Sequence, residues 1–209
     1  IKFDALSIII NSPGGSPVQS SLIAQKIREV CSKKKVKCYC FVEDVAASGG
    51  YWLACAADEI YADVNSIVGS IGVISGGFGF TELIKKIGVE RRIFTAGENK
   101  SFLDPFQKVN KKDEEKLKTL QKQIHQNFID WVKSRRKKKL KEKDIKKIFS
   151  GSFWLSSQAK ELGLIDGIFS ESSFFKSKFG DKTKIKKIKP PKTLKQKLGL
   201  GISSFNSDE

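Results

Sequence analysis

ALSIII at residues 5–10, followed by NSPGGSP at 11–17, is the stretch that decides the fold. Its apolar first half is strand-sized and predicts a buried strand, and its glycines and prolines predict a loop. An amphipathic helix is expected over about 18–33, and VKCYCFV at 36–42 predicts a second strand. A strand, a helix and a strand joined by short connections favour a parallel pair with a right-handed crossover.

The alternation of strands and helices continues to about residue 97. We expect, in order, a helical run YWLACAA at 51–57, a strand EIYAD at 59–63, a loop NSIVGSIG at 65–72, a helix TELIKKIG at 81–88 and a strand VERRIFTAG at 89–97. The sequence therefore predicts an α/β fold with a mostly parallel sheet.

A different pattern begins near Lys111. Apolar residues recur every three to four positions over 113–132 and predict a long helix, which ends in the basic run RRKKKLKEK at 135–143. The segment 150–169, SGSFWLSSQAKELGLIDGIF, predicts a strand, a turn and a helix that ends at a glycine. We therefore expect a helical segment in the C-terminal part of the fold.

The length of 209 residues allows one main domain, which we expect over residues 1–172, followed by a lysine-rich tail over 173–209. The chain opens on Ile1 and contains no methionine, so we expect a fragment whose N-terminal edge is truncated. Its composition is 39% hydrophobic and 30% charged, and no apolar run approaches the ~20 residues of a spanning helix. Disordered, collagenous and membrane-spanning classes are excluded.

The net charge of +16 comes mainly from lysine, because only five of the 39 basic residues are arginine. A protein that reads a nucleic-acid sequence depends on the fork geometry of arginine, so we expect no specific nucleic-acid partner. Three explanations of the lysines stay open: a compositional habit, a contact with an anionic membrane surface, and a general nucleic-acid face.

Histidine and cysteine do not supply a catalytic pair. His125, the only histidine, lies in the long predicted helix and is expected to have a structural or surface role. The four cysteines lack CxxC and zinc spacing and are expected to be buried free thiols: Cys31, Cys38, Cys40 and Cys55. A hydrolase would then need another base, and lysine can serve once desolvation lowers the pKa of its amine.

Three segments have features that acyl chemistry needs. The paired glycines of NSPGG at 11–15 let backbone amides approach a ligand. AASGG at 46–50 sets Ser48 between a strand and a helix, where the first helical amides attract negative charge. TAGENKSFLDPF at 95–106 carries Lys100 in a loop beside apolar residues. Taken singly, each has a plain alternative: a turn, a helix-capping serine and an exposed lysine.

Together, four strings resemble the signal peptide peptidase A group of serine–lysine peptidases over roughly residues 4–170. They are INSPGGSP, DVAASGGYW, IVGSIGV and GENKSFLDPF, in that order. The resemblance implies a Clp/crotonase-like fold with repeated β-β-α and βαβ units. It also implies that Ser48 is the nucleophile, that Lys100 is the general base, and that Ser70 orients the lysine.

The same resemblance implies an oxyanion hole and a substrate. The amide of Gly49 is expected to join that of Gly14 or Gly15, with Gly15 preferred, and Val73 and Ile74 are candidates for an apolar specificity pocket. The expected substrates are peptides, such as cleaved signal peptides or membrane-associated protein fragments. No metal or cofactor is implied.

The chain carries one copy of the motif with the nucleophilic serine and one copy of the motif with the lysine. In this it is similar to the single-length, SohB-like members of that group. Such members resemble rings in which a site can draw on neighbouring protomers, so we expect a homo-oligomer. Two arrangements stay open: Lys100 acts in the site of its own chain, or it acts in trans in a shared active site. The expected location is membrane-associated, or cytoplasmic if the native protein has no anchor.

Two other functions stay open. A crotonase-like enzyme that handles CoA thioesters also uses paired amides, but it leaves the AASGG serine and the lysine loop unexplained. A non-catalytic module could bind anionic lipid or nucleic acid through residues 133–143 and the tail. Aromatic residues are not interleaved with that basic run, which disfavours base stacking.

Overall fold

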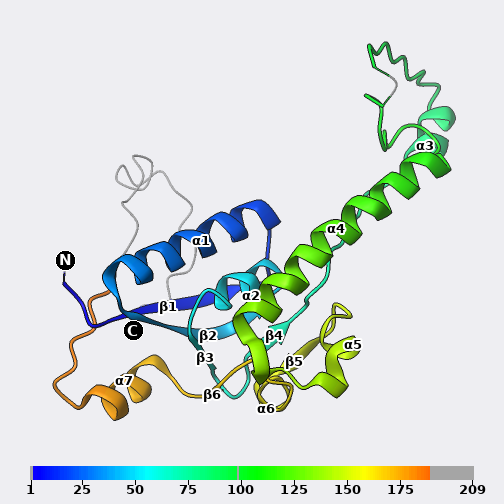
Figure 1. Ribbon diagram of the computed structural model, residues 1–209. Helices are drawn as coiled ribbons and strands as arrows, with labels where there is room; N and C mark the ends of the chain where they lie inside the picture. The colour runs from blue at the N-terminus through cyan, green and yellow to red at the C-terminus, as the bar shows by residue number, and fades with distance from the viewer. Residues whose placement is uncertain (1, 98, 189–209) are drawn as a thin grey trace. The chain divides into compact units, whose positions relative to one another are not determined.

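The structure, a computed structural model, describes residues 2–97 and 99–188 (Figure 1). Contacts divide the chain into two units after Phe174, and the sheet lies in the first unit. The prolines expected in the tail, Pro190 and Pro191, lie outside the described residues. None of the helices in the described ranges combines the length and the hydrophobicity needed to span a bilayer.

Six strands of the described chain form one sheet: β1 (Ala5–Ser12), β2 (Lys37–Ala47), β3 (Glu59–Ala62), β4 (Ile67–Gly69), β5 (Phe153–Leu155) and β6 (Gly167–Ile168). The longest strand, β2, pairs in parallel with β1, β3 and β4, and β3 pairs in parallel with β6. Only the β4–β5 pair among the described strands is antiparallel. The expected α/β fold with a mostly parallel sheet is confirmed.

Seven α-helices accompany these strands in the described chain: α1 (Pro17–Lys34), α2 (Gly49–Ala54), α3 (Thr81–Lys86), α4 (Lys111–Arg136), α5 (Ile145–Ile148), α6 (Ser156–Glu161) and α7 (Glu171–Phe179). Short 3₁₀ turns cover Lys137–Lys139 and Glu142–Asp144. Helix α1 begins where the Ser16 hydroxyl accepts the Gln19 amide and Pro17 takes the first helical position. It ends at Lys35, which adopts the left-handed conformation.

The core lies between one face of β2 and the helices α1, α2 and α4. The four cysteines are all buried there as free thiols, which confirms the expectation. Burial raises the pKa of Cys55 to about 12, so this thiol stays protonated at neutral pH. The opposite face of β2 carries Tyr39 and Phe41, which pack against Phe174.

Two expected elements are different in the structure. The segment 65–72, expected to be a loop, contains the three-residue strand β4, which pairs with Val45, Ala46 and Ala47 of β2. The segment 89–97, expected to be a strand, is irregular over its described residues. Its side chains are mostly exposed, and none of the strands in the described chain pairs with it through backbone hydrogen bonds.

The basic run at 135–143 has two parts: its lysines are exposed, whereas its two arginines are engaged with other residues of the chain. Arg136 is 2% exposed, donates to the Gly163 carbonyl over 3.0 and 2.9 Å, and pairs with Asp166 at 2.8 Å. Arg135 donates to the Cys55 carbonyl and pairs with Asp58. Both arginines therefore tie the end of α4 to the core.

Candidate active site

Three of the four sequence motifs leave the sheet at neighbouring strand ends. Strand β1 ends at Ser12, β2 at Ala47 and β4 at Gly69. Ser12 lies opposite Ala46, and Ala47 lies opposite Gly69. Because these strands are parallel, the segments that follow them start side by side at one edge (Figure 1). We call residues 12–15, 47–50 and 69–72 the strand-end cluster.

Ser48 occupies the sharp turn between β2 and α2. Its backbone has φ 50° and ψ −120°, a conformation that costs a non-glycine residue energy. The turn is held because the Ser48 amide donates to the Gly69 carbonyl at 2.9 Å, and its carbonyl accepts the Trp52 amide at 3.0 Å. The Ser48 hydroxyl caps no amide of α2, so the helix-capping alternative does not explain this serine.

The glycines around Ser48 permit backbone contacts that a side chain would block. A Cβ on Gly14 would lie 2.8 Å from the Ser48 Cβ, at a residue whose φ is +118°. A Cβ on Gly49 would lie 2.5 Å from the Ser20 Oγ and 3.1 Å from the Gly15 nitrogen. The loop at 14–15 therefore lies directly against the turn that carries Ser48.

Two amides near Ser48 can receive an oxyanion. The Gly49 amide is the first of α2, so it has no partner within the helix. The Gly14 amide donates to the Ser12 Oγ at 3.2 Å, whereas the Gly15 amide has no acceptor among the described residues. This geometry favours Gly15 over Gly14 as the second donor.

Ser70 lies one residue beyond the ladder pair that precedes Ser48. It also has a positive φ, 53°, and its amide donates to the Ser152 carbonyl at 2.7 Å. The next residue, Ile71, accepts a hydrogen bond at 3.0 Å from the Nε2 of His125. His125 therefore has the structural role expected of it, because it ties α4 to the cluster.

Lys100 lies in a different part of the chain, in a segment that we call the arm, residues 73–110. Lys100 is exposed, and its loop is tied to the start of α4 by the Leu103 amide, which donates to Asp113, and by Lys116 above the Phe102 ring. None of the described residues of the arm is buried.

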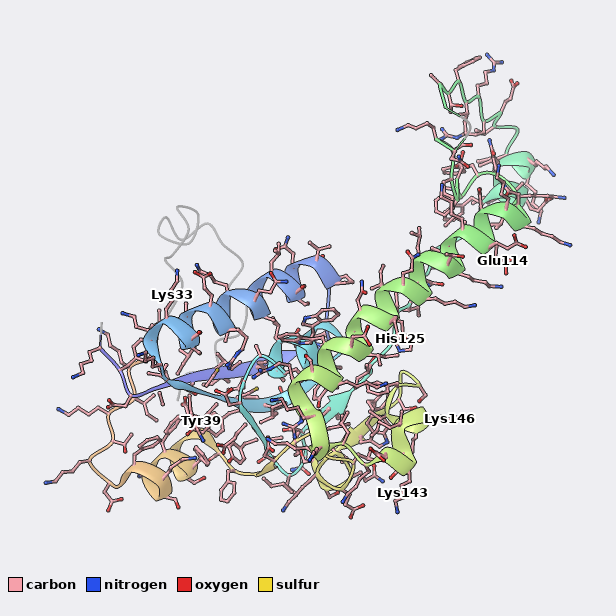
Figure 2. All side chains as sticks on the ribbon, in the orientation of Figure 1. Lys33, Tyr39, Glu114, His125, Lys143 and Lys146 are labelled. Atoms are coloured by element: carbon pink, nitrogen blue, oxygen red, sulfur yellow. The ribbon has the colours of Figure 1, made fainter. Side chains whose placement is uncertain are left out.

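Helix α4 separates this loop from Ser48. Phe128 and Trp131 of α4 stack on Trp52 of α2, whereas the arm contacts Asp113 and Lys116. From Lys116 to Phe128, at 1.5 Å per residue, the helix spans on the order of 20 Å. In Figure 2, Glu114 lies at the arm end of α4, and His125 lies nearer the sheet. In this structure Lys100 therefore lies at the end of α4 that is remote from Ser48.

The candidate specificity residues follow the strand-end cluster directly. Val73 is half-buried, and Ile74 is 93% exposed. Their role as a specificity pocket stays a prediction.

Sequence reasoning assigned no role to Ser12, Ser20 or Ser152, which support the cluster. Ser12 and Ser20 flank the glycine loop, so their closeness in sequence was the available signal. Ser152 reaches Ser70 only through the β4–β5 pairing, which the sequence does not reveal.

Comparison with known proteins finds a matching family and several similar chains. Residues 30–179 match the model of peptidase family S49. A putative protease of Methanocaldococcus jannaschii is 34% identical over 81% of this chain and 53% of its own length. The probable protease SohB of Haemophilus influenzae is 30% identical over 94% of this chain and 54% of its own length.

A longer protein is also similar to this chain. The Na(+)/H(+) antiporter NhaA of Brucella melitensis is 55% identical over 96% of this chain, but the match covers 27% of that protein. The chain thus spans about a quarter of the Brucella protein and about half of the two proteases. The similarity concerns one part of each relative.

Proposed function

The chain belongs to peptidase family S49, and on that premise we propose that it is a serine endopeptidase with Ser48 as nucleophile and Lys100 as general base. The observation that carries this proposal is the strained turn at Ser48, with φ 50° and ψ −120°, in contact with the loop at 14–15. A strained turn between a strand and a helix exposes a nucleophile beside backbone amides. We further propose that the parallel βαβ arrangement is of the Clp/crotonase type.

The chemistry uses groups of the chain alone. Lys100, acting as the general base, takes the proton of the Ser48 hydroxyl, and the oxygen attacks the scissile carbonyl carbon. The amides of Gly49 and Gly15 stabilise the oxyanion, and the protonated lysine gives its proton to the leaving amine. Lys100 then takes a proton from water, the hydroxide attacks the acyl carbon, and the protonated lysine returns the proton to the departing Ser48 oxygen, which releases the acid and restores both residues. The Ser70 hydroxyl orients the lysine at the neighbouring strand end.

In this proposal the lysine comes from a second copy of the chain. Lys100 and Ser48 lie at opposite ends of the span of α4 that separates arm and cluster. Within the described part of the chain, three apolar side chains of the arm are largely exposed: Ile74, Phe78 and Phe94 are 93%, 81% and 94% exposed. Assembly would cover these side chains and bring one arm to the neighbouring cluster.

The proposed substrates are peptides, such as cleaved signal peptides or membrane-associated protein fragments, held extended across the strand ends. Of the alternatives, a crotonase-like enzyme gives no reason for a strained serine at residue 48. A basic binding module is weakened because Arg135 and Arg136 are engaged with the core.

Labelling with a fluorophosphonate, followed by mass spectrometry of the full chain, tests the proposal. Modification confined to Ser48 supports a serine peptidase, because the reagent reports an activated serine hydroxyl. No modification, or modification of other serines at the same rate, contradicts it. Ser21 provides an internal control, since it lies on α1 and its hydroxyl accepts a hydrogen bond from the side chain of Gln25.

A further inference from the structure

We propose that Ser12 is a positioning residue, whose hydroxyl holds the Gly14 amide so that the Gly15 amide is presented to the oxyanion. The inference rests on the proposed function, because it assigns a role within that site. It is carried by one hydrogen bond, from the Gly14 amide to the Ser12 Oγ at 3.2 Å, and by the packing around Ser12.

An irregularity in the sheet brings Ser12 to this place. Strands β1 and β2 pair regularly as far as Ile10 opposite Val42, but the next pair is Ser12 opposite Ala46. Two side chains hold this shift: the Asn11 amide donates to Asp44 at 2.7 Å, and the Ser66 hydroxyl donates to the Val42 carbonyl at 3.1 Å. Ser12 therefore lies beside Ala46, which is near the end of β2 and two residues before Ser48.

Helix α2 fixes Ser12 from the other side. A Cβ on Gly50 would lie 2.5 Å from the Ser12 carbonyl oxygen and 3.3 Å from its Cβ. Ser12 is thus in close contact with the helix that follows the nucleophile, while its hydroxyl contacts the glycine loop. Ser12 therefore lies between the two segments that supply the proposed oxyanion donors, the loop at 14–15 and the start of α2.

This hydrogen bond determines which of the two glycine amides is available to an oxyanion. With the Gly14 amide bound to Ser12, only the Gly15 amide of this pair is free to meet a ligand. Gly14 has φ +118°, and glycine peptides in this region reorient easily when no partner holds them. Without the hydroxyl, the loop would sample orientations that turn the Gly15 amide away from Ser48.

The test compares Ser12→Ala with Ser12→Thr in the full chain. Ser12→Ala is expected to lower kcat about tenfold with KM changed less than about twofold, because oxyanion donors act mainly in the transition state. Affinity for a peptide aldehyde, whose adduct places an oxyanion in the same hole, is expected to fall by a similar factor. Ser12→Thr keeps the acceptor and is expected to recover most of the activity.

Two further variants keep the result decisive. Ser16→Ala removes the α1 cap from the same loop, so we expect a lower Tm with kcat unchanged. Ser12→Cys keeps the size of serine but is a weak acceptor, so it should be as slow as Ser12→Ala even if the alanine variant folds poorly.

The inference is overturned if Ser12→Ala or Ser12→Cys turns over peptide at the wild-type rate, or if the threonine variant is as slow as they are. It is also overturned if Ser16→Ala reproduces the loss in kcat, since stability would then explain it. Failure of the proposed function is distinguishable, because the wild-type chain would then show no fluorophosphonate label on Ser48.

Discussion

The strand-end cluster and the arm differ in how much of their geometry one chain determines. In the cluster, ladder pairs, backbone hydrogen bonds and glycine contacts hold Ser48 beside the loop at 14–15, and Ser70 follows the neighbouring strand β4. In the arm, no described residue is buried, and Phe94 is 94% exposed. The fold of one chain therefore organises the proposed nucleophile and oxyanion amides, whereas the proposed base lies on an element without buried residues in the described chain.

The largest expected effect is at the cluster itself. Ser48→Ala should lower peptide hydrolysis by about a thousandfold or more, because it removes the proposed nucleophile. The fold should be unchanged, since only an oxygen is lost from a half-buried side chain. A peptide cleavage assay and circular dichroism on the same preparation measure both effects. Activity within about tenfold of wild type would contradict the role of Ser48.

The arm is tested by its lysine. Lys100→Arg should be as damaging as Lys100→Ala, about a hundredfold or more, because a guanidinium stays protonated and cannot act as a base. Lys108→Arg, at an exposed lysine of the same arm, should keep full activity. Steady-state kinetics of the three variants provide the measurement. If Lys100→Arg retains most of the activity, another group is the base.

The core behind the cluster should be sensitive to the loss of Arg136. Arg136→Met leaves Asp166 half-buried with one of its two cations gone, so the free energy of unfolding should fall by about 3–5 kcal/mol. Urea unfolding compares this variant with Arg92→Met, an exposed arginine of the arm that pairs with Glu90. We expect less than about 1 kcal/mol for the arm variant. If the two variants lose the same free energy of unfolding, the buried Arg136 contributes no more to stability than the exposed Arg92, which would contradict this prediction.

A smaller effect is expected on acidification. Burial alone would raise the pKa of Asp166, but hydrogen bonds and charge from Arg136 and Lys139 outweigh it and hold that pKa below its usual value. A carboxyl whose pKa is lowered on folding stabilises the fold above about pH 4, and this stability is lost as pH falls through the folded pKa. Tm should therefore fall below about pH 4, and Asp166→Asn should flatten that part of the profile. If the Tm of Asp166→Asn falls below about pH 4 as steeply as that of the wild type, Asp166 does not have this role.

The sequence predicted the elements whose patterns are local. The strand at 5–10, the helix near 18–33 and the long helix near 113–132 lie within a few residues of β1, α1 and α4. Strand β4 was missed because three residues ending in glycine show no periodicity. The segment 89–97 has strand-like composition, but a strand also needs a partner, which composition does not show.

The candidate site also has parts that the sequence predicts and parts that it does not. Parallel strands whose carboxyl ends meet make the proximity of NSPGG, AASGG and GSIG predictable from their order. The choice of Gly15 over Gly14 depends on the Ser12 hydroxyl, and the burial of Arg136 depends on Gly163 and Asp166, which are distant in sequence. The position of Lys100 was not predictable, since its loop precedes α4 and contacts the first turn of that helix, far from the sheet.

The most direct test of a site divided between cluster and arm is complementation. Ser48→Ala and Lys100→Ala chains carry different tags, are co-expressed, and are purified through both tags in sequence. Each variant alone should be inactive, and the mixed assembly should recover part of the wild-type activity, because some interfaces join an intact Ser48 to an intact Lys100. A mixed assembly that carries both tags and stays inactive would contradict the account, as would a monomeric wild-type chain that cleaves peptide.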